Sequence, residues 1–203
     1  MLPSPVDTER FKPDSRAGAR ARREMGCGKG DRLVLSVGRV VEEKNYDFLL
    51  KVAKAMGGEG VKFAVVGKGP YLEQLKREAG RMGLGSTVHF AGFVPHEKLV
   101  GYYNAADCFV FPSKFETQGL TLLEAFACGK PAAVLQGTAM GELLQQGRNG
   151  FSFSESEKEC AEALLKCMER EGKLSQGARK TALLHSIPRL SRKLAGIYKR
   201  LLG

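Results

Sequence analysis

The sequence predicts an α/β fold whose core is one doubly wound, Rossmann-like parallel sheet. Short apolar runs, such as residues 63–66 and 108–111, alternate along the chain with amphipathic segments of helical periodicity. The runs are apolar at every position rather than at alternate positions, which is typical of parallel strands buried on both faces. In such a sheet, ligands bind beyond the carboxyl ends of the strands, where the strand-to-helix loops gather.

The expected elements follow one another in strand–helix order, after an irregular lead-in and a short basic helix that ends near Gly26. Strands are predicted over residues 33–38, 61–67, 87–93, 107–113, 131–135 and 150–153. Helices are predicted over residues 45–56, 71–82, 96–106, 119–129 and 141–147, and from residue 155 to the end, with Pro188 opening the last helix. We therefore divide the chain into a connector (1–14), a nucleotide-sugar-binding Rossmann-like domain (15–187) and a C-terminal basic helix (188–203).

The positive net charge of the chain bears on which binding partners are expected. The 203 residues carry a formal net charge of +10, and basic residues concentrate towards the two ends of the chain. Such an excess can attract a nucleotide or an anionic membrane surface, although a solvated basic face explains it equally well. Nucleic acid is disfavoured, because the sequence contains neither a zinc-finger spacing nor an aromatic–basic RNA-binding signature.

No apolar stretch approaches the roughly 20 residues of a membrane span, and the first residues contain no apolar signal core. The five cysteines are scattered and odd in number, which predicts reduced, packed thiols rather than a disulfide framework. No cluster of His, Asp and Cys suggests a metal site. We expect a cytoplasmic protein, with peripheral contact to the inner membrane face left open.

Two early loops place chemistry at the carboxyl edge of the sheet. After the first strand, Gly38 permits a tight exit, and Arg39 and Lys44 supply two cations suited to a diphosphate, although solvated surface charge is the better reading of this loop alone. After the second strand, Gly67 and Gly69 resemble a truncated dinucleotide fingerprint without its third glycine or a later ribose-binding acid. A nicotinamide cofactor is therefore not expected, and a glycine turn before a helix that opens at Pro70 explains the spacing.

A third loop, after the fourth strand, combines two acids with a helix start. Gly119 is expected at or near the helix N-terminus, where the amides of Gly119, Leu120 and Thr121 lack helical partners and favour an anion. Glu116 precedes the helix, and Glu124 follows Leu120 by four on nearly the same helical face. Two carboxylates around a phosphate site suit the hydroxyls of two sugars. Taken by itself, however, this pattern is better explained without a ligand, by one acid at the N-terminus of the helix and one acid that is buried and paired.

Together these motifs resemble the donor-binding half of retaining, GT-B-fold glycosyltransferases of the large family-four group. The resemblance covers roughly residues 4–200 and rests on the order and spacing of GRVVEEKN, VVGKGP, FAGFVP, FVFPS, two glutamates with seven residues between them, LLEAFACGKP and GELLQQGRNGFSF. The resemblance implies that the substrate is a nucleoside diphosphate sugar, such as a UDP-sugar. It implies no metal and no other cofactor.

The resemblance also implies a role for each site residue. Glu116 would contact the transferred sugar, and Glu124 would bind the ribose hydroxyls. Arg39 and Lys44 would hold the diphosphate and stabilise it as it leaves. Other implied donor contacts are Gly38, Phe93, Val94, Gly119, Leu120 and Thr121, with the base near Phe93 and Val94 and the amides of the last three sharing the diphosphate charge.

The sequence departs from the common pattern in two respects. Gln118 stands where many relatives have an aromatic residue, and the segment ETQGLTLLEA resembles the version found in diacylglycerol glucosyltransferases, which favours a lipid acceptor. The N-terminal acceptor domain of a GT-B enzyme has no counterpart here, and PSPVDTERFKPD (3–14) resembles the connector that leads out of it. We therefore expect a donor-binding domain, or a natural half-protein with a separate partner, and little turnover by the chain alone.

Two rival functions stay open. One is a non-catalytic module that binds nucleotide sugars or supports a partner, and the other is a GT-B-fold sugar-nucleotide epimerase. The presence of both Glu116 and Glu124 favours transfer over each rival. The sugar, the base, the acceptor and the oligomeric state are not indicated by the sequence.

Overall fold

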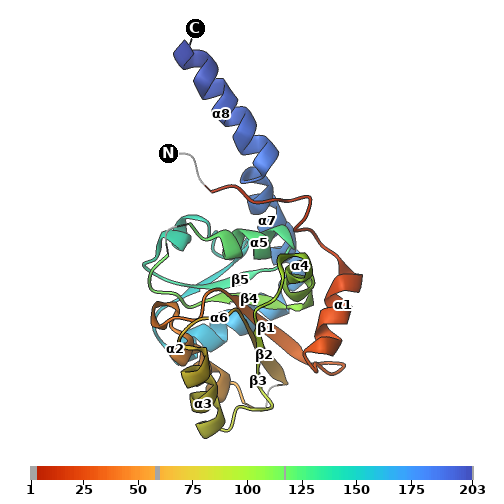
Figure 1. Cartoon of the computed structure of the whole chain (residues 1–203), viewed down its shortest axis with the longest axis vertical. Helices are drawn as coiled ribbons and strands as arrows, with labels where there is room; N and C mark the ends of the chain where they lie inside the picture. The colour runs from red at the N-terminus through yellow and green to blue at the C-terminus, as the bar shows by residue number, and fades with distance from the viewer. Residues whose placement is uncertain (1–3, 58–59, 117, 203) are drawn as a thin grey trace.

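A computed structural model, which describes residues 4–57, 60–116 and 118–202, contains a parallel sheet covered by helices on both faces (Figure 1). Its six strands lie in the order β3-β2-β1-β4-β5-β6, and all neighbours pair in parallel. The strands are β1 (Arg32–Val37), β2 (Val61–Val66), β3 (Val88–Gly92), β4 (Cys108–Phe111), β5 (Ala132–Leu135) and β6 (Gly150–Phe153). The predicted doubly wound α/β fold is confirmed.

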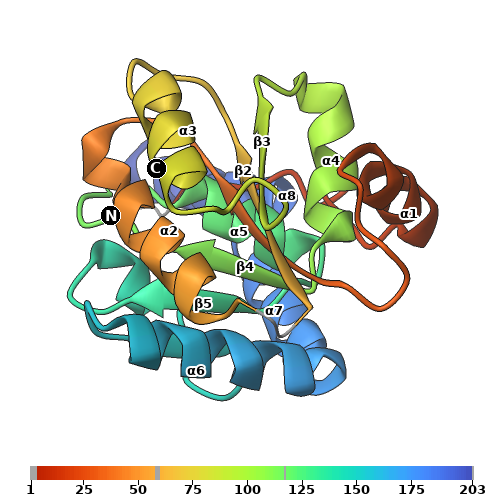
Figure 2. The same cartoon turned by 90° about the horizontal axis from the view of Figure 1, so that it is seen from below.

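The helices divide into two layers, each with its own buried core (Figure 2). One face of the sheet is covered by α2 (Tyr46–Ala55), α3 (Leu72–Arg81) and α6 (Glu157–Glu169). The other face is covered by α1 (Ser15–Glu24), α4 (His96–Ala105), α5 (Leu120–Ala127) and α7 (Glu171–Leu184). The strands contribute to both cores because successive side chains of a strand point to opposite faces, so strands buried on both sides are apolar throughout.

The strand order reverses between β1 and β4. The chain builds outward from β1 to β2 and β3, and then returns to place β4 on the other side of β1. The chain therefore leaves β1 and β4 towards helices on opposite faces of the sheet, α2 and α5. In doubly wound sheets this topological switch point is where ligands bind.

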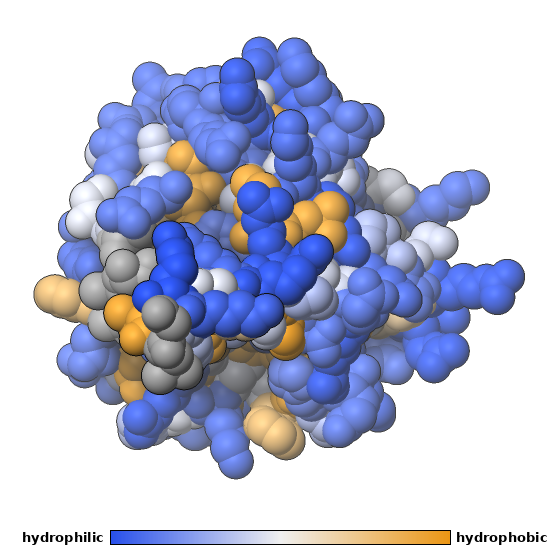
Figure 3. Space-filling model, turned by 90° about the horizontal axis from the view of Figure 1, so that it is seen from above, coloured by the Kyte–Doolittle hydropathy of each residue, from blue (hydrophilic) through white to orange (hydrophobic). Residues whose placement is uncertain are grey.

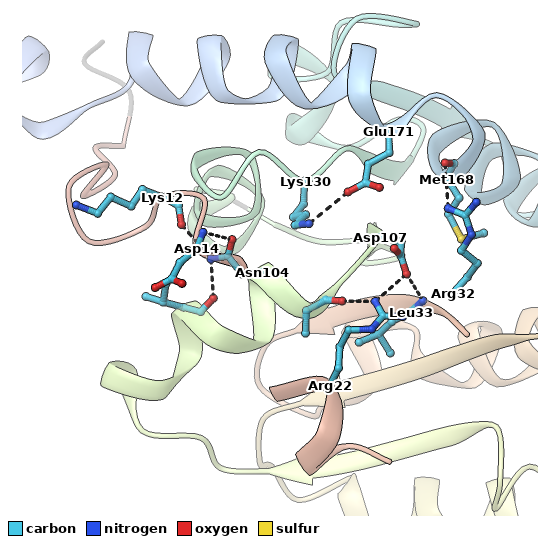
Figure 4. A network of polar contacts seen from close by, with 12 residues as sticks. Lys12, Asp14, Arg22, Arg32, Leu33, Asn104, Asp107, Lys130, Met168 and Glu171 are labelled. Atoms are coloured by element: carbon cyan, nitrogen blue, oxygen red, sulfur yellow. Dashed lines mark hydrogen bonds and ion pairs between the residues drawn. The ribbon is translucent and has the colours of Figure 1, made fainter. Parts of the chain in front are cut away.

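The opposite end of the sheet is held by a network of partly buried charged groups that Figure 4 shows. The Asp107 carboxylate accepts from the backbone N–H of Leu33 at 2.6 Å and from Arg22 Nη1 at 3.1 Å. Arg22 Nη1 also donates to the Ala105 carbonyl at 2.7 Å, so α1 is tied to the end of α4 and to the start of β1. Gly18 of α1 allows this close approach, because a Cβ there would lie 2.7 Å from the Asn104 carbonyl oxygen.

Residues 4–14 carry no helix or extended strand, in keeping with the irregular lead-in that we predict, but they pack firmly on the domain. Phe11 is buried, and Arg179 of α7 donates to the carbonyls of Phe11 at 2.8 Å and Thr8 at 3.0 Å. Val6 exchanges backbone hydrogen bonds with His185 and Ile187 at the start of the last helix. The lead-in is thus an ordered part of the core around α4 and α5.

The last helix, α8 (Ile187–Leu202), projects away from the body of the molecule (Figure 1). It contains five basic residues and no acidic residue, and several of its large apolar side chains are exposed: Ile187, Leu194, Tyr198 and Leu201. Figure 3, seen from this end, shows apolar groups among a mainly hydrophilic surface. No helix among the described residues is long and apolar enough to cross a membrane.

One predicted helix is wrong. Residues 141–147 do not form a helix; a short 3₁₀ turn, η2 (Ala139–Glu142), is followed by turns. The cause is Asn149, whose buried side chain accepts from the Gln145 N–H at 2.7 Å and donates to the Leu143 carbonyl at 2.9 Å. These bonds satisfy backbone groups that a helix would otherwise pair.

Candidate functional site

The residues that the sequence analysis selects all lie at the carboxyl edge of the sheet, in the loops after β1, β3 and β4 or at the start of α5. The loops after β1 and β4 flank the topological switch point. Between them they bring the two predicted cations and the two predicted acids to one edge of the molecule, as a parallel sheet requires of residues that follow its strands.

The loop after β1 is shaped by its contact with the loop after β2. A Cβ on Gly67 would lie 1.8 Å from the Gly38 carbonyl oxygen, and a Cβ on Gly69 would lie 2.1 Å from that of Val40. Gly67 also has φ +143°, a backbone conformation that glycine adopts readily. These glycines therefore serve the close packing of two loops. The helix begins two residues later than the expected start at Pro70: α3 begins at Leu72, and the Tyr71 N–H before it donates to the Val40 carbonyl at 3.2 Å.

Lys44 and Glu116 form an ion pair across the switch point. Lys44 Nζ lies 2.5 Å from Glu116 Oε2, and each side chain is about four-fifths buried, with 22% and 20% of its surface exposed. The backbone supports the pair, since Lys114 N donates to the Glu43 carbonyl at 3.2 Å and so ties the loop after β4 to the 3₁₀ helix η1 (Glu42–Lys44). The ammonium and the carboxylate thus occupy the position where the two loops meet.

Arg39 lies on the same edge and is exposed, and its guanidinium makes no hydrogen bond or ion pair with any described residue. A second exposed cation, Lys68, follows β2 and sits 4.9 Å from the centre of the Phe93 ring. Phe93 is 66% exposed, whereas its neighbour Val94 is half-buried and packs on the core beside α4. The site therefore presents an aromatic face and more positive charge than the sequence analysis assigned to it.

Gly119 forms the amino end of α5 and makes room there for the Met140 side chain. This residue caps the helix with φ 60° and ψ 30°, and a Cβ on it would meet the Met140 sulfur at 2.0 Å. The N–H groups of Leu120 and Thr121 donate to none of the described residues, as expected for a first helical turn. The backbone amide of Gln118 reaches towards Glu116 Oε1 at 3.5 Å. Thr117 lies outside the described residues.

Glu124 projects from α5 and is largely buried. Its Oε2 accepts from the Tyr103 hydroxyl at 2.7 Å, and its Oε1 lies 3.9 Å from His96 Nε2. The carboxylate side chain is 15% exposed. Burial raises the pKa of Glu124 above its ordinary value, while the hydrogen bond from Tyr103 and the nearby charges of His96 and Arg10 act in the opposite direction.

We expect Glu124→Gln to gain stability relative to the parent chain as pH rises. A carboxyl whose pKa is raised by folding contributes stability below its unfolded pKa, and that contribution is lost as pH rises from the ordinary 4.5 through the raised folded value. Glutamine keeps the acceptor for Tyr103 and cannot ionise. Urea unfolding at pH 4.5 and pH 7.5 checks this, and a variant that loses relative stability at pH 7.5 would contradict it.

The structure joins some predicted residues directly and others only through neighbours. Lys44 contacts Glu116, whereas Glu124 contacts Tyr103 and lies near His96, neither of which the sequence analysis selects. Lys68 is not among the predicted site residues, although it stands between Gly67 and Gly69 in the loop after β2. The position of Lys68 directly after a predicted strand could have identified it as a site residue. No sequence pattern could have identified Tyr103, because it lies inside a helix rather than at the end of a strand.

A family model described as "Glycosyl transferases group 1" matches residues 19–183. Over 159 residues, 73% of this chain, the sequence is 35% identical to the GDP-mannose-dependent alpha-(1-6)-phosphatidylinositol monomannoside mannosyltransferase of Mycolicibacterium smegmatis. Over 149 residues it is 34% identical to the alpha-monoglucosyldiacylglycerol synthase of Streptococcus pneumoniae. The matched regions span 41% and 34% of the lengths of these two relatives.

Solved structures agree with the fold. The Anabaena protein HepE in complex with UDP and glucose superposes with a TM-score of 0.86 at 21% identity, over 96% of this chain and 55% of HepE. The C-terminal domain of the group 1 glycosyl transferase LpcC from Francisella tularensis superposes with a TM-score of 0.76 at 21% identity, over 90% of this chain and 99% of that domain. At such identities these likenesses establish the architecture.

Proposed function

This chain belongs to the glycosyl transferases group 1 family, and from that premise we propose that it is the donor-binding part of a retaining glycosyltransferase. The donor is a nucleoside diphosphate sugar, and the reaction moves its hexose to a lipid or glycan acceptor. The observation that carries the proposal is the Lys44–Glu116 ion pair at the switch point of the sheet, in the loop that leads into α5, whose Leu120 and Thr121 N–H groups donate to none of the described residues.

The diphosphate would occupy the space between the loop after β1 and the start of α5. Arg39 offers a fork of donors without a competing partner among the described residues, and Lys44 offers a point charge. The amides of Gly119, Leu120 and Thr121 add partial positive charge. When the bond from the sugar to the diphosphate breaks, negative charge develops on the leaving oxygen, and these preorganised groups stabilise it. The proposal requires no metal and no other cofactor.

The two acids would then flank the diphosphate. Glu116, held by Lys44, faces the transferred hexose. The bond from the sugar to the diphosphate breaks, the acceptor oxygen bonds to the same sugar face, which retains the configuration, and the acceptor's proton passes to the leaving diphosphate oxygen. Glu124 accepts from the ribose hydroxyls. The base rests beside Phe93 and Val94, where the exposed ring of Phe93 offers a stacking surface. Gly38 keeps the β1 loop close enough for its backbone to contact the donor.

Two relatives support a lipid acceptor, because their names include phosphatidylinositol monomannoside and monoglucosyldiacylglycerol. The names of relatives and neighbours include both GDP-mannose and UDP, so either base fits. Acceptor binding and full turnover would need the part of the relatives' length that this chain does not match. A cytoplasmic site at an anionic membrane surface accords with the five basic residues of α8.

The proposal is tested by calorimetric titration of the chain with UDP, GDP, ADP and their sugar conjugates. We expect saturable binding that prefers one base and that Glu124→Ala weakens. A matched acid, Glu73→Ala on the exposed face of α3, should leave binding unchanged. Absence of binding by a folded sample, or binding indifferent to Glu124→Ala, would contradict the proposal.

A further inference from the structure

Tyr103 is buried completely, yet its hydroxyl group reaches the proposed ribose-binding carboxylate. The side chain has 0% of its surface exposed, and the hydroxyl donates to Glu124 Oε2 at 2.7 Å. Tyr103 comes from α4 and Glu124 from α5, so the bond links two helices of the same layer. Burial with a single polar contact makes this hydroxyl a specific partner of one carboxylate oxygen.

The ring of Tyr103 is held by aromatic neighbours from other elements. Phe11 of the lead-in meets it edge-on, with ring centroids 5.7 Å apart and an interplanar angle of 83°. Phe109 of β4 lies on another side, with centroids 5.9 Å apart. Phe11 is itself fixed, because Arg179 donates to its carbonyl at 2.8 Å. The Tyr103 hydroxyl therefore has little freedom to leave Glu124.

This arrangement divides the carboxylate of Glu124 between two tasks. Oε2 is occupied by Tyr103, whereas Oε1 faces the more open side, where His96 Nε2 lies 3.9 Å away and the imidazole is exposed. A glutamate side chain has three rotatable bonds, and fixing them when a ligand binds costs conformational entropy, which weakens binding. A carboxylate already held through one oxygen can bind a hydroxyl with the other at smaller cost.

We propose that Tyr103 is a positioning residue for nucleotide binding, which orients Glu124 so that its second oxygen accepts from the ribose. The inference rests on the proposed function, since it takes Glu124 as the ribose-binding group. Tyr103 itself touches no ligand. Electrostatics support the role: burial disfavours the ionised carboxylate, and the hydrogen bond from Tyr103, together with the charges of His96 and Arg10, favours the ionised form that accepts best from hydroxyls.

The test is the affinity of the chain for UDP and GDP after Tyr103→Phe, measured by calorimetry in the parent chain and in the Glu124→Ala background. Phenylalanine keeps the ring and removes only the hydroxyl. We expect a loss of about fivefold in the parent chain, as for one hydrogen bond, and no more than about twofold once Glu124 is absent. Tyr102→Phe, next to it on α4 but only half-buried, is the matched control and should change neither.

Equal losses in both backgrounds would show that Tyr103 acts only through general stability and would overturn the inference, as would no loss in the parent chain. If Glu124→Ala weakens binding but Tyr103→Phe does not, this inference fails alone. If Glu124→Ala has no effect, the proposed function fails with it. Should Tyr103→Phe not fold, Phe11→Leu carries the test: it loosens the ring, and a loss that disappears in the Glu124→Ala background is again expected.

Discussion

Removing both site cations, in the double variant Arg39→Ala/Lys44→Ala, should reduce the affinity of the chain for a nucleoside diphosphate by about 100-fold or more. Each charged hydrogen bond contributes about 1.5–3 kcal/mol, which corresponds to roughly 10- to 100-fold in a dissociation constant. Arg39 has no partner among the described residues, so its charge is available to the ligand. Calorimetric titration of parent and variant measures the loss.

The two single variants should differ in size. Lys44→Ala also leaves the Glu116 carboxylate without the ammonium group that lies 2.5 Å from it, and this negative charge then repels the diphosphate. Lys44→Ala should therefore weaken binding more than Arg39→Ala does. Lys54→Ala, an equal charge change near the far end of α2, should have no effect. Equal losses from Lys44→Ala and Lys54→Ala would show that bulk charge, not the site, attracts the nucleotide.

Gly67→Ala should destabilise the fold by about 3–5 kcal/mol, as an unfavourable backbone conformation and an overpacked contact each cost about 1–3 kcal/mol. The residue has φ +143°, and the added Cβ would lie 1.8 Å from the Gly38 carbonyl oxygen. That oxygen belongs to the backbone, so no side-chain rotation relieves the contact. For a chain of this size the melting temperature should fall by about 10 °C or more. Thermal unfolding followed by circular dichroism measures the change.

The nearby Gly80→Ala provides the matched control. Gly80 lies on the exposed face of α3, has no positive φ, and an added Cβ would meet nothing within 4 Å. Alanine there should stabilise the helix by up to about 1 kcal/mol. If Gly67→Ala melted at the same temperature as the parent chain, the close packing of the loops after β1 and β2 would be contradicted.

The fold was predictable because its pattern is local. The strands are mainly apolar, and most connecting segments have helical periodicity, so the sheet and its two helical layers follow from the sequence. The last predicted helix before β6 failed because of a side chain just beyond it in the sequence. Asn149, which follows that segment, folds back to pair with Leu143 and Gln145, and no periodicity in residues 141–147 reveals this.

The site was predictable only where it depends on strand ends. Lys44 and Glu116 follow β1 and β4, which the doubly wound order makes neighbours, so their meeting follows from topology. Gly67 and Gly69 show the limit of spacing, because a glycine that lets another loop approach looks the same in sequence as one that lets a ligand approach. Tyr103 meets Glu124 through the packing of α4 beside α5, which the sequence does not disclose.

The most direct test of the donor site is the amide NMR spectrum of the chain during titration with UDP or GDP, whichever base binds. We expect the N–H signals of Gly38, Gly119, Leu120 and Thr121 to shift saturably, while those of α6 and α7 stay unchanged. Gly119, Leu120 and Thr121 lie at the amino end of α5, and Gly38 lies at the end of β1, on the two sides of the switch point. The Gly38 N–H donates to the Val66 carbonyl at 3.0 Å, so its signal reports the nearby charge of the diphosphate. Saturable shifts that leave all four unmoved, and that appear on another face of the sheet, would contradict the assignment of the donor site.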